Sequence, residues 1–155
     1  KVGWVCGSGG IIIKTTDGGK TWTKQNSGLT HFFYSIQFIS PLTGWIVGGY
    51  GAVMKTTDGG TSWFKQNTQP DLSIFQSSTF FYGMQFTDSL TGCIVGDEGR
   101  IIRTTNSGEI VVDQTSSTRE VLYGIHFADT QVGWAVGGKE TILKTTDGGV
   151  TWSKQ

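Results

Sequence analysis

The sequence predicts an all-β repeat fold built from small antiparallel sheets. A turn motif, Thr-x-Asp/Asn-x-Gly followed by an aromatic residue, occurs four times, with its first threonine at Thr15, Thr56, Thr104 and Thr145. The intervals between copies are 41, 48 and 41 residues, a spacing typical of β-propeller blades with four short strands each. Glycine is abundant (24 residues) and proline scarce (2), which is typical of a β protein with many tight turns.

The repeated motif predicts a tight turn between two strands. Asp-Gly-Gly between β-prone runs is a hairpin signal, because glycine adopts positive φ without steric cost. The Asp side chain accepts hydrogen bonds from backbone N–H groups just ahead of it, and the aromatic residue covers the turn. The third copy departs, with Asn106 in place of Asp and Val111 in place of Trp. We therefore interpret the motif positions as structural: Thr15, Asp17, Gly19, Trp22, Thr56, Asp58, Gly60, Trp63, Thr104, Asn106, Gly108, Thr145, Asp147, Gly149 and Trp152.

The second copy shows the four strands of one unit most clearly. We expect strand a at 33–39, strand b at 45–48, strand c at 52–56 and strand d at 62–66. In the later copies strand a recurs at 82–86 and 123–127, strand b at 92–96 and 133–137, and strand c at 100–104 and 141–145. The first copy begins on strand b, at 3–7.

These units predict one repeat domain, 1–155, with about four blades. The blades are a partial one at 1–28 and whole ones at 29–69, 70–118 and 119–155. So few complete blades do not readily close a ring, and repeat units need neighbours to bury their faces. We expect part of a larger propeller, or a ring completed by self-association of several chains.

Charge and cysteine content exclude several classes of function. Twelve basic and twelve acidic residues cancel, which argues against a nucleic-acid partner held by general charge. No apolar run approaches the length that spans a bilayer. No metal-binding spacing occurs, and no cofactor is expected. Cys6 and Cys93 fall at core positions of different repeats and are expected to be free thiols.

Cationic residues recur at two repeat positions. One lies just before each Thr-Thr pair and another lies on strand d. We favour exposed positions that block edge-to-edge strand pairing over a basic ring for an acidic partner. The first set is Lys14, Lys55, Arg103 and Lys144, and the second is Lys24, Lys65 and Lys154.

Binding residues are expected on the face that carries the b–c turns and the d–a loops, since function concentrates in loops. The loop 67–79 holds the seven-residue excess of the longer interval and carries Leu72, Ile74 and Phe75. These apolar residues predict a docking site, with packing onto the neighbouring blade as the alternative. We interpret His126 as a polar residue that lines the channel. The b–c turns of the same face add Tyr50, Asp97, Glu98, Arg100, Lys139 and Glu140 as candidate partner-binding residues.

The repeated string resembles a known family. Gly133-Trp134-Ala135-Val136-Gly137 through Lys144-Thr145-Thr146-Asp147-Gly148-Gly149 is similar to the Asp-box, or bacterial neuraminidase repeat (BNR), proteins. Within them it most resembles the photosystem II stability/assembly factor type, found in photosynthetic and other bacteria. The resemblance implies an extracytoplasmic (periplasmic, lumenal or secreted), non-enzymatic protein that binds a membrane-protein subunit. An arginine-rich surface is associated with the photosynthetic members, and this sequence has Arg100, Arg103 and Arg119.

Two classes of function remain open at this point. We favour a non-catalytic propeller that binds an unknown protein partner through its loop face, because no catalytic constellation is apparent. The alternative is a glycoside hydrolase of sialidase or xyloglucanase type, since such enzymes carry Asp boxes, and it requires paired carboxylates. Asp97 or Glu98 with Glu140 is the acidic pair available on one face. A carbohydrate-binding propeller that uses Tyr50 and channel aromatics is also open.

Overall fold

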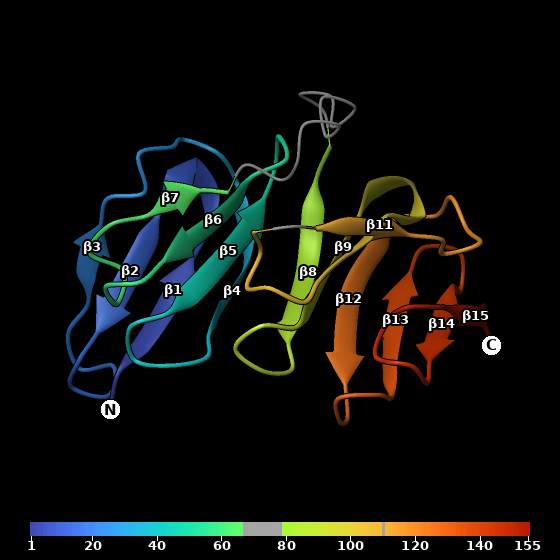
Figure 1. The fold of residues 1–155 in the computed structure, drawn as a ribbon. Coiled ribbons are helices and arrows are strands. Elements are labelled where there is room, and N and C mark those ends of the chain that lie inside the picture. The colour runs from blue at the N-terminus through green and yellow to red at the C-terminus, as the bar shows by residue number, and fades with distance from the viewer. Residues whose placement is uncertain (67–78, 110) are drawn as a thin grey trace.

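The computed structural model describes residues 1–66, 79–109 and 111–155, and these form four consecutive antiparallel sheets (Figure 1). Each sheet is one blade whose strands pair in chain order. The all-β prediction and the four blades are confirmed. Blade 1 has β1 (Gly3–Cys6), β2 (Ile12–Thr15) and β3 (Thr23–Gln25); blade 2 has β4 (Phe33–Phe38), β5 (Gly44–Gly48), β6 (Val53–Thr56) and β7 (Phe64–Lys65); blade 3 has β8 (Phe81–Phe86), β9 (Gly92–Gly96), β10 (Ile101–Thr104) and β11 (Val112–Gln114); blade 4 has β12 (Leu122–Phe127), β13 (Gly133–Gly137), β14 (Ile142–Thr145) and β15 (Ser153–Lys154).

The predicted strands a, b and c agree with the structure to within one residue. Strand d is shorter than predicted, since β7 and β15 have two residues each. The first residues of the predicted strand d still belong to the Asp-box turn, where side chains rather than a strand ladder bind the backbone. Two short 3-10 turns, η1 (Ser8–Gly10) and η3 (Asp97–Gly99), connect strands b and c in blades 1 and 3. In the described ranges no helix is long and apolar enough to cross a membrane.

The core lies between blades rather than within one sheet. Alternate residues of strands b and c point to opposite sides, as the two-residue period of a strand requires. In blade 2, Ile46 and Met54 pack with Ile12 of blade 1. Val47 and Val53 pack instead with Ile94 of blade 3, in a second cluster. Each blade therefore buries its apolar residues only by stacking on its neighbours.

Three of the four cations before the Thr-Thr pairs bind across these junctions, so the interpretation of those three as exposed guards of a strand edge is wrong. Lys14 Nζ donates to the Gly59 carbonyl at 2.8 Å, and Lys55 Nζ donates to the Ser107 carbonyl at 3.0 Å. Arg103 Nε donates to the Gly148 carbonyl at 2.7 Å. Strand c lies inside its sheet, and its cation reaches the Asp-box turn of the next blade. The lysines of strand d are exposed.

The inner strands β4, β8 and β12 are also bonded to one another across the junctions. Gln37 accepts from the Phe86 N–H at 2.7 Å and donates to the Phe86 carbonyl at 3.0 Å. Gln85 makes the same two bonds to Phe127, at 2.7 and 3.2 Å. His126 occupies this position in blade 4 and is exposed. The glutamines at this position hold neighbouring blades together, and the channel-lining role of His126 stays a prediction.

The two cysteines are free, as predicted. Cys93 is buried, and burial raises the pKa of its thiol to about 12. Burial likewise raises the pKa of Cys6 to about 11. Both thiols are therefore protonated and poorly reactive at neutral pH. Among the described residues, no group of three His, Cys, Asp or Glu side chains is placed to hold a metal ion.

Candidate protein-binding surface

Backbone hydrogen bonds divide the loops between two faces. On one face each Asp-box turn binds the a–b turn of its own blade: the Gly59 N–H donates to the Leu42 carbonyl at 2.8 Å. On the other face the b–c turns of blades 1 and 2 bind the segments that lead into blades 2 and 3. The Gly10 N–H donates to the His31 carbonyl at 2.7 Å, and the Gly51 N–H donates to the Thr79 carbonyl at 2.8 Å. We call this second side the loop face.

In the Asp-box turns the polar side chains bind the local backbone. Thr56 Oγ1 donates to the Asp58 carboxylate at 2.8 Å and accepts from the Gly60 N–H at 2.9 Å. Asp58 in turn accepts from the Ser62 N–H at 2.9 Å. The boxes of Asp17 and Asp147 repeat this network. These carboxylates stabilise turns and have no geometry for acid–base chemistry. Asn106 accepts from Thr104 Oγ1 at 3.0 Å, so the third box closes with a neutral side chain.

The acidic boxes predict a stability loss in acid. Hydrogen bonds from the Thr151 hydroxyl and backbone lower the pKa of Asp147 to about 2, and the pKa values of Asp17 and Asp58 are lowered too. In the unfolded chain an Asp has a pKa of about 3.9. The lowered pKa of Asp147 therefore stabilises the folded protein fully above about pH 3.9, and this contribution to the free energy of unfolding is lost as the pH falls to about 2. We expect the urea midpoint to fall between pH 5 and pH 2. In Asp147→Asn the urea midpoint should decrease less between pH 5 and pH 2 than in the unaltered protein. An equal decrease in both proteins would contradict the role of the carboxylate.

Each complete inner strand carries a β-bulge at a tyrosine. In β4, Phe33 pairs with Gly48 and Ser35 with Val47, which leaves Tyr34 unpaired. Tyr82 in β8 and Tyr123 in β12 are skipped in the same way. A bulge inserts one residue and redirects its side chain out of the ladder. The three tyrosines therefore leave the core and lie along the inner strands.

These tyrosines belong to a continuous aromatic surface that spans blades 2, 3 and 4. Ring centroids lie 5.0 Å apart between Tyr34 and Tyr82, and 5.5 Å apart between Tyr82 and Tyr123. Exposed aromatic area of this extent is unusual on a protein surface that binds nothing. Phe32, Tyr34, Tyr50 and Tyr123 are 44–57% exposed, whereas Phe80 and Tyr82 are half-buried. We define the aromatic surface as Phe32, Tyr34, Tyr50, Phe80, Tyr82 and Tyr123.

Asp97 fixes the centre of this surface. Its carboxylate accepts a hydrogen bond from the Phe80 N–H at 2.8 Å. Burial and the neighbouring Asp97 carboxylate, which the Tyr82 hydroxyl faces, raise the pKa of Tyr82 to about 12. Both residues are therefore held in place, with Tyr82 neutral and Asp97 engaged in structure.

The partner-binding role of the remaining candidates in the b–c turns stays a prediction. Glu98, Lys139 and Glu140 adopt positive φ, like Tyr50. Lys139 forms an exposed ion pair with Glu120 at 3.0 Å, and Arg100 pairs with Asp113 at 3.4 Å. Of the predicted candidates within the described ranges, Tyr50 belongs to the aromatic surface and Asp97 binds the backbone of Phe80 beside it. Leu72, Ile74 and Phe75 lie outside the described residues, so their docking role stays a prediction.

Sequence reasoning missed most of the aromatic surface. Tyr34, Tyr82 and Tyr123 occupy one repeat position in three copies, and that recurrence was the available signal. Phe32 and Phe80 also match each other, just before strand a. An alternating strand pattern alone does not identify these residues as exposed, because the bulge interrupts the alternation.

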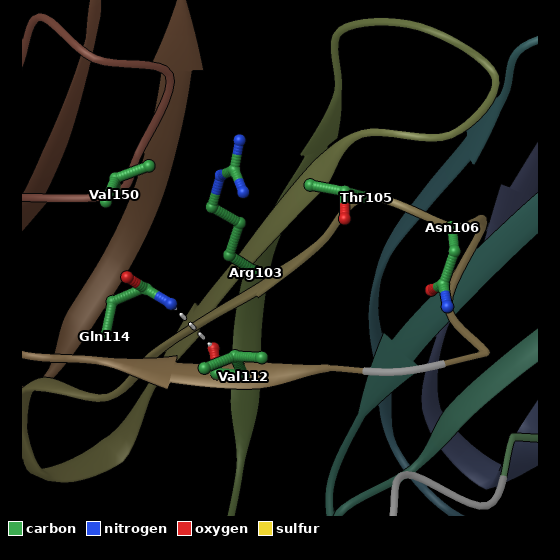
Figure 2. Close-up of a pocket in the computed structure, with 6 residues that line it drawn as sticks. All are labelled: Arg103, Thr105, Asn106, Val112, Gln114 and Val150. Atoms are coloured by element: carbon green, nitrogen blue, oxygen red, sulfur yellow. Dashed lines mark hydrogen bonds between the residues drawn. The ribbon is translucent and has the colours of Figure 1, made fainter.

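A hollow of about 270 Å³ lies at the junction of blades 3 and 4 (Figure 2). Arg103 is the positively charged residue that lines this hollow. Gln114 Nε2, also in the lining, donates to the Val112 carbonyl at 3.2 Å. The described residues that line the hollow include no carboxylate, histidine or cysteine, so they supply no carboxylate pair of the kind that glycoside hydrolysis uses. The lining residues are Arg103, Thr105, Asn106, Val112, Gln114 and Val150.

The stacked four-stranded blades and the closed Thr-Asp-Gly turns define an Asp-box β-propeller protein. The sequence model of the BNR/Asp-box repeat family matches residues 13–24. The model described as photosynthesis system II assembly factor YCF48 matches residues 27–111 and 111–155. The chain belongs to this family.

Individual relatives agree with this assignment. The photosystem II assembly protein Ycf48 of Synechococcus sp. (strain JA-3-3Ab) is 50% identical over 40 residues, which are 24% of this chain and 12% of that protein. A structure of YCF48 bound to D1 peptide matches with a TM-score of 0.69 and 24% identity. That match covers 81% of this chain but only 39% of the YCF48 chain. The GH74 enzyme of Niastella koreensis matches with a TM-score of 0.77 and 16% identity, over 99% of this chain and 27% of that chain. At these identities the solved structures show a shared fold.

Proposed function

We propose that the protein is a non-catalytic propeller that binds a protein partner through the aromatic surface of its loop face. The exposed aromatic surface carries the proposal. Tyrosine is enriched among the residues that carry most of the binding energy at protein interfaces, because it supplies apolar area and a hydroxyl group. The surface also extends over three blades, which suits a partner larger than a single side chain.

Family membership supports an assembly-factor role. A YCF48 structure holds a D1 peptide, and that protein therefore binds a protein segment. By extension, the partner proposed here is a segment of a membrane-protein subunit, met outside the cytoplasm. The segment 67–79, with Leu72, Ile74 and Phe75, is proposed as a second part of the docking site.

The enzyme alternative has less support from the geometry. Asp97, half of the predicted acidic pair, is engaged by the Phe80 N–H and by Tyr82. Glu98 and Glu140 stand in the b–c turns of different blades at positive φ. A general acid needs a raised pKa, whereas the pKa values of the Asp-box carboxylates Asp17, Asp58 and Asp147 are lowered.

Binding of the D1 peptide, measured by titration calorimetry, tests the proposal. The double variant Tyr34→Ala and Tyr123→Ala should bind at least about tenfold more weakly, because each truncation removes aromatic contact area. Both side chains are exposed, so the fold should persist, and circular dichroism checks this.

The matched control lies on the opposite face. Leu42 and Leu90 are exposed apolar residues of the a–b turns, 60% and 53% exposed. Leu42→Ala with Leu90→Ala should leave binding unchanged. Equal loss in both double variants, or none in the tyrosine variant, would contradict the choice of surface. No binding by the unaltered chain would refute the D1-type partner, and affinity capture from a native extract would then test the surface with its own partner.

A further inference from the structure

The rings of the aromatic surface come from three successive blades and stay open to a ligand. Tyr34, Tyr50 and Tyr123 are 44–57% exposed. Phe80 joins them, with its ring centroid 5.6 Å from that of Tyr50. Within the described ranges, lysines stack on rings elsewhere and leave the aromatic surface uncovered. These stacked pairs are Lys14 with Trp4, Lys55 with Trp45, and Lys144 with Trp134.

The spacing of the tyrosine rings suits a cationic group. A cation is attracted to the face of an aromatic ring when it lies within about 6 Å of the ring centroid. The Tyr82 centroid lies 5.0 Å from that of Tyr34 and 5.5 Å from that of Tyr123. A cation placed over either pair is therefore within reach of two rings at once.

A carboxylate lies beside the middle of these rings. Asp97 accepts from the Phe80 N–H at 2.8 Å, and the Tyr82 hydroxyl faces the same carboxylate. No lysine or arginine of the described ranges forms an ion pair with it, since the ion pairs there join Arg100 with Asp113 and Lys139 with Glu120. Aromatic faces carry the negative part of the ring quadrupole, so the rings and the carboxylate attract the same kind of ligand, a cation.

The loops around the aromatic surface add further negative charge. Arg100 and Asp113 neutralise each other in their ion pair. The other charged residues in the described b–c turns and d–a loops leave an excess of acidic over basic side chains, although the whole sequence is neutral. The acidic residues are Asp97, Glu98, Glu120 and Glu140, and the basic ones are Arg119 and Lys139. The loop face therefore favours a positively charged ligand.

We infer that the partner of the aromatic surface is a basic protein segment, and that one of its arginine or lysine side chains lies over the tyrosine rings beside Asp97. This inference rests on the binding surface proposed above and adds the charge of the segment that it takes. Arginine fits best, because its planar guanidinium stacks on aromatic rings and donates to carboxylates in the same orientation. An acidic segment meets like charge on this face and is rejected.

Titration calorimetry with two matched peptides tests the inference. One is an unstructured peptide of glycine, serine and leucine that carries several arginines, and the other has neutral citrulline in place of each arginine. The unaltered protein should bind the arginine peptide about tenfold more tightly. This preference should shrink in concentrated sodium chloride, because salt screens exposed charges. The double variant Tyr34→Ala and Tyr123→Ala should lose the preference, whereas Tyr34→Phe with Tyr123→Phe should keep it, since phenylalanine retains the ring face.

Two exposed glutamates provide a matched pair of charge variants. Glu98→Gln removes a negative charge from the b–c turn next to Asp97 and should weaken binding of the arginine peptide alone. Glu109→Gln removes the same charge from the Asp-box turn of blade 3, on the opposite face, and should change neither titration.

Three results would overturn the inference: equal affinity for the two peptides, no binding of either, or an arginine preference that survives the alanine variant. The titration with D1 peptide separates these from failure of the proposed function. If the alanine variant loses D1 peptide while the arginine and citrulline peptides bind equally, the aromatic surface remains a binding site and only the charge of its ligand is wrong. If the arginine preference depends on the tyrosines but D1 peptide does not bind, the basic ligand stands and the D1-type partner fails.

Discussion

Gly96→Ala is expected to destabilise the protein by about 3 kcal/mol or more, a large fraction of the stability of a domain this size. A Cβ at Gly96 would lie 2.2 Å from the Phe80 carbonyl oxygen and 3.0 Å from the Phe81 ring. The Phe80 carbonyl cannot retreat freely, because it accepts from the Asp97 N–H at 3.0 Å. The free energy of unfolding from urea titration measures the effect. Gly48 and Gly137 are equally confined, by carbonyl oxygens at 2.1 and 2.2 Å.

Gly7→Ala is the control for this change, because Gly7 holds the same repeat position in blade 1. A Cβ there meets nothing within 4 Å, and its φ of −171° is extended backbone that any residue adopts. We expect a change within about 1 kcal/mol, with stabilisation through the restricted unfolded chain as the expected direction. Equal destabilisation by both substitutions would mean that the crowding at Gly96 is not the cause.

Thr56→Val is expected to cost about 2–3 kcal/mol while it keeps the shape of the side chain. Thr56 is fully buried, and its hydroxyl accepts from the Gly60 N–H at 2.9 Å and the Asp58 N–H at 3.3 Å. Valine leaves these donors without that acceptor inside the turn. Urea titration again measures the loss.

The neighbouring threonine separates this effect from a general loss of strand propensity. Thr57 is exposed and follows Thr56 directly. Thr57→Val should therefore change stability by less than about 0.5 kcal/mol, as for ordinary surface positions. If the two variants were equally stable, the hydroxyl of the Asp box would not be the source of its stabilisation.

The sequence predicted the fold well, because each blade repeats strong local signals. Asp-Gly-Gly places the turns, and the runs at 44–48 and 92–96 are apolar strands bounded by glycine. Three aligned copies then fix the strand register. Local chemistry therefore determined every strand except the bounds of the short strand d, whose first residues remain in the turn.

The contacts and exposure of side chains were harder to predict, because they depend on how the blades stack. Lys55 looks like an exposed strand residue in sequence, yet it lies 5.2 Å from the Trp45 ring centre and binds Ser107 across the junction. Tyr34 is exposed only because a bulge interrupts the alternation of β4. Neither the junction geometry nor the bulge follows from the period of the sequence, and the aromatic surface depends on the bulges.

The cross-junction bonds give the molecule a direction of growth. Lys14, Lys55 and Arg103 each reach forward, from one blade to the Asp-box turn of the blade that follows in the chain. During synthesis from the N-terminus, each new blade thus packs on a preceding blade that has already folded. That preceding blade supplies the cation and the apolar residues of the junction. The same directionality lets a gene lengthen by duplication of whole 41-residue units, since an added blade finds its contacts in residues that already exist.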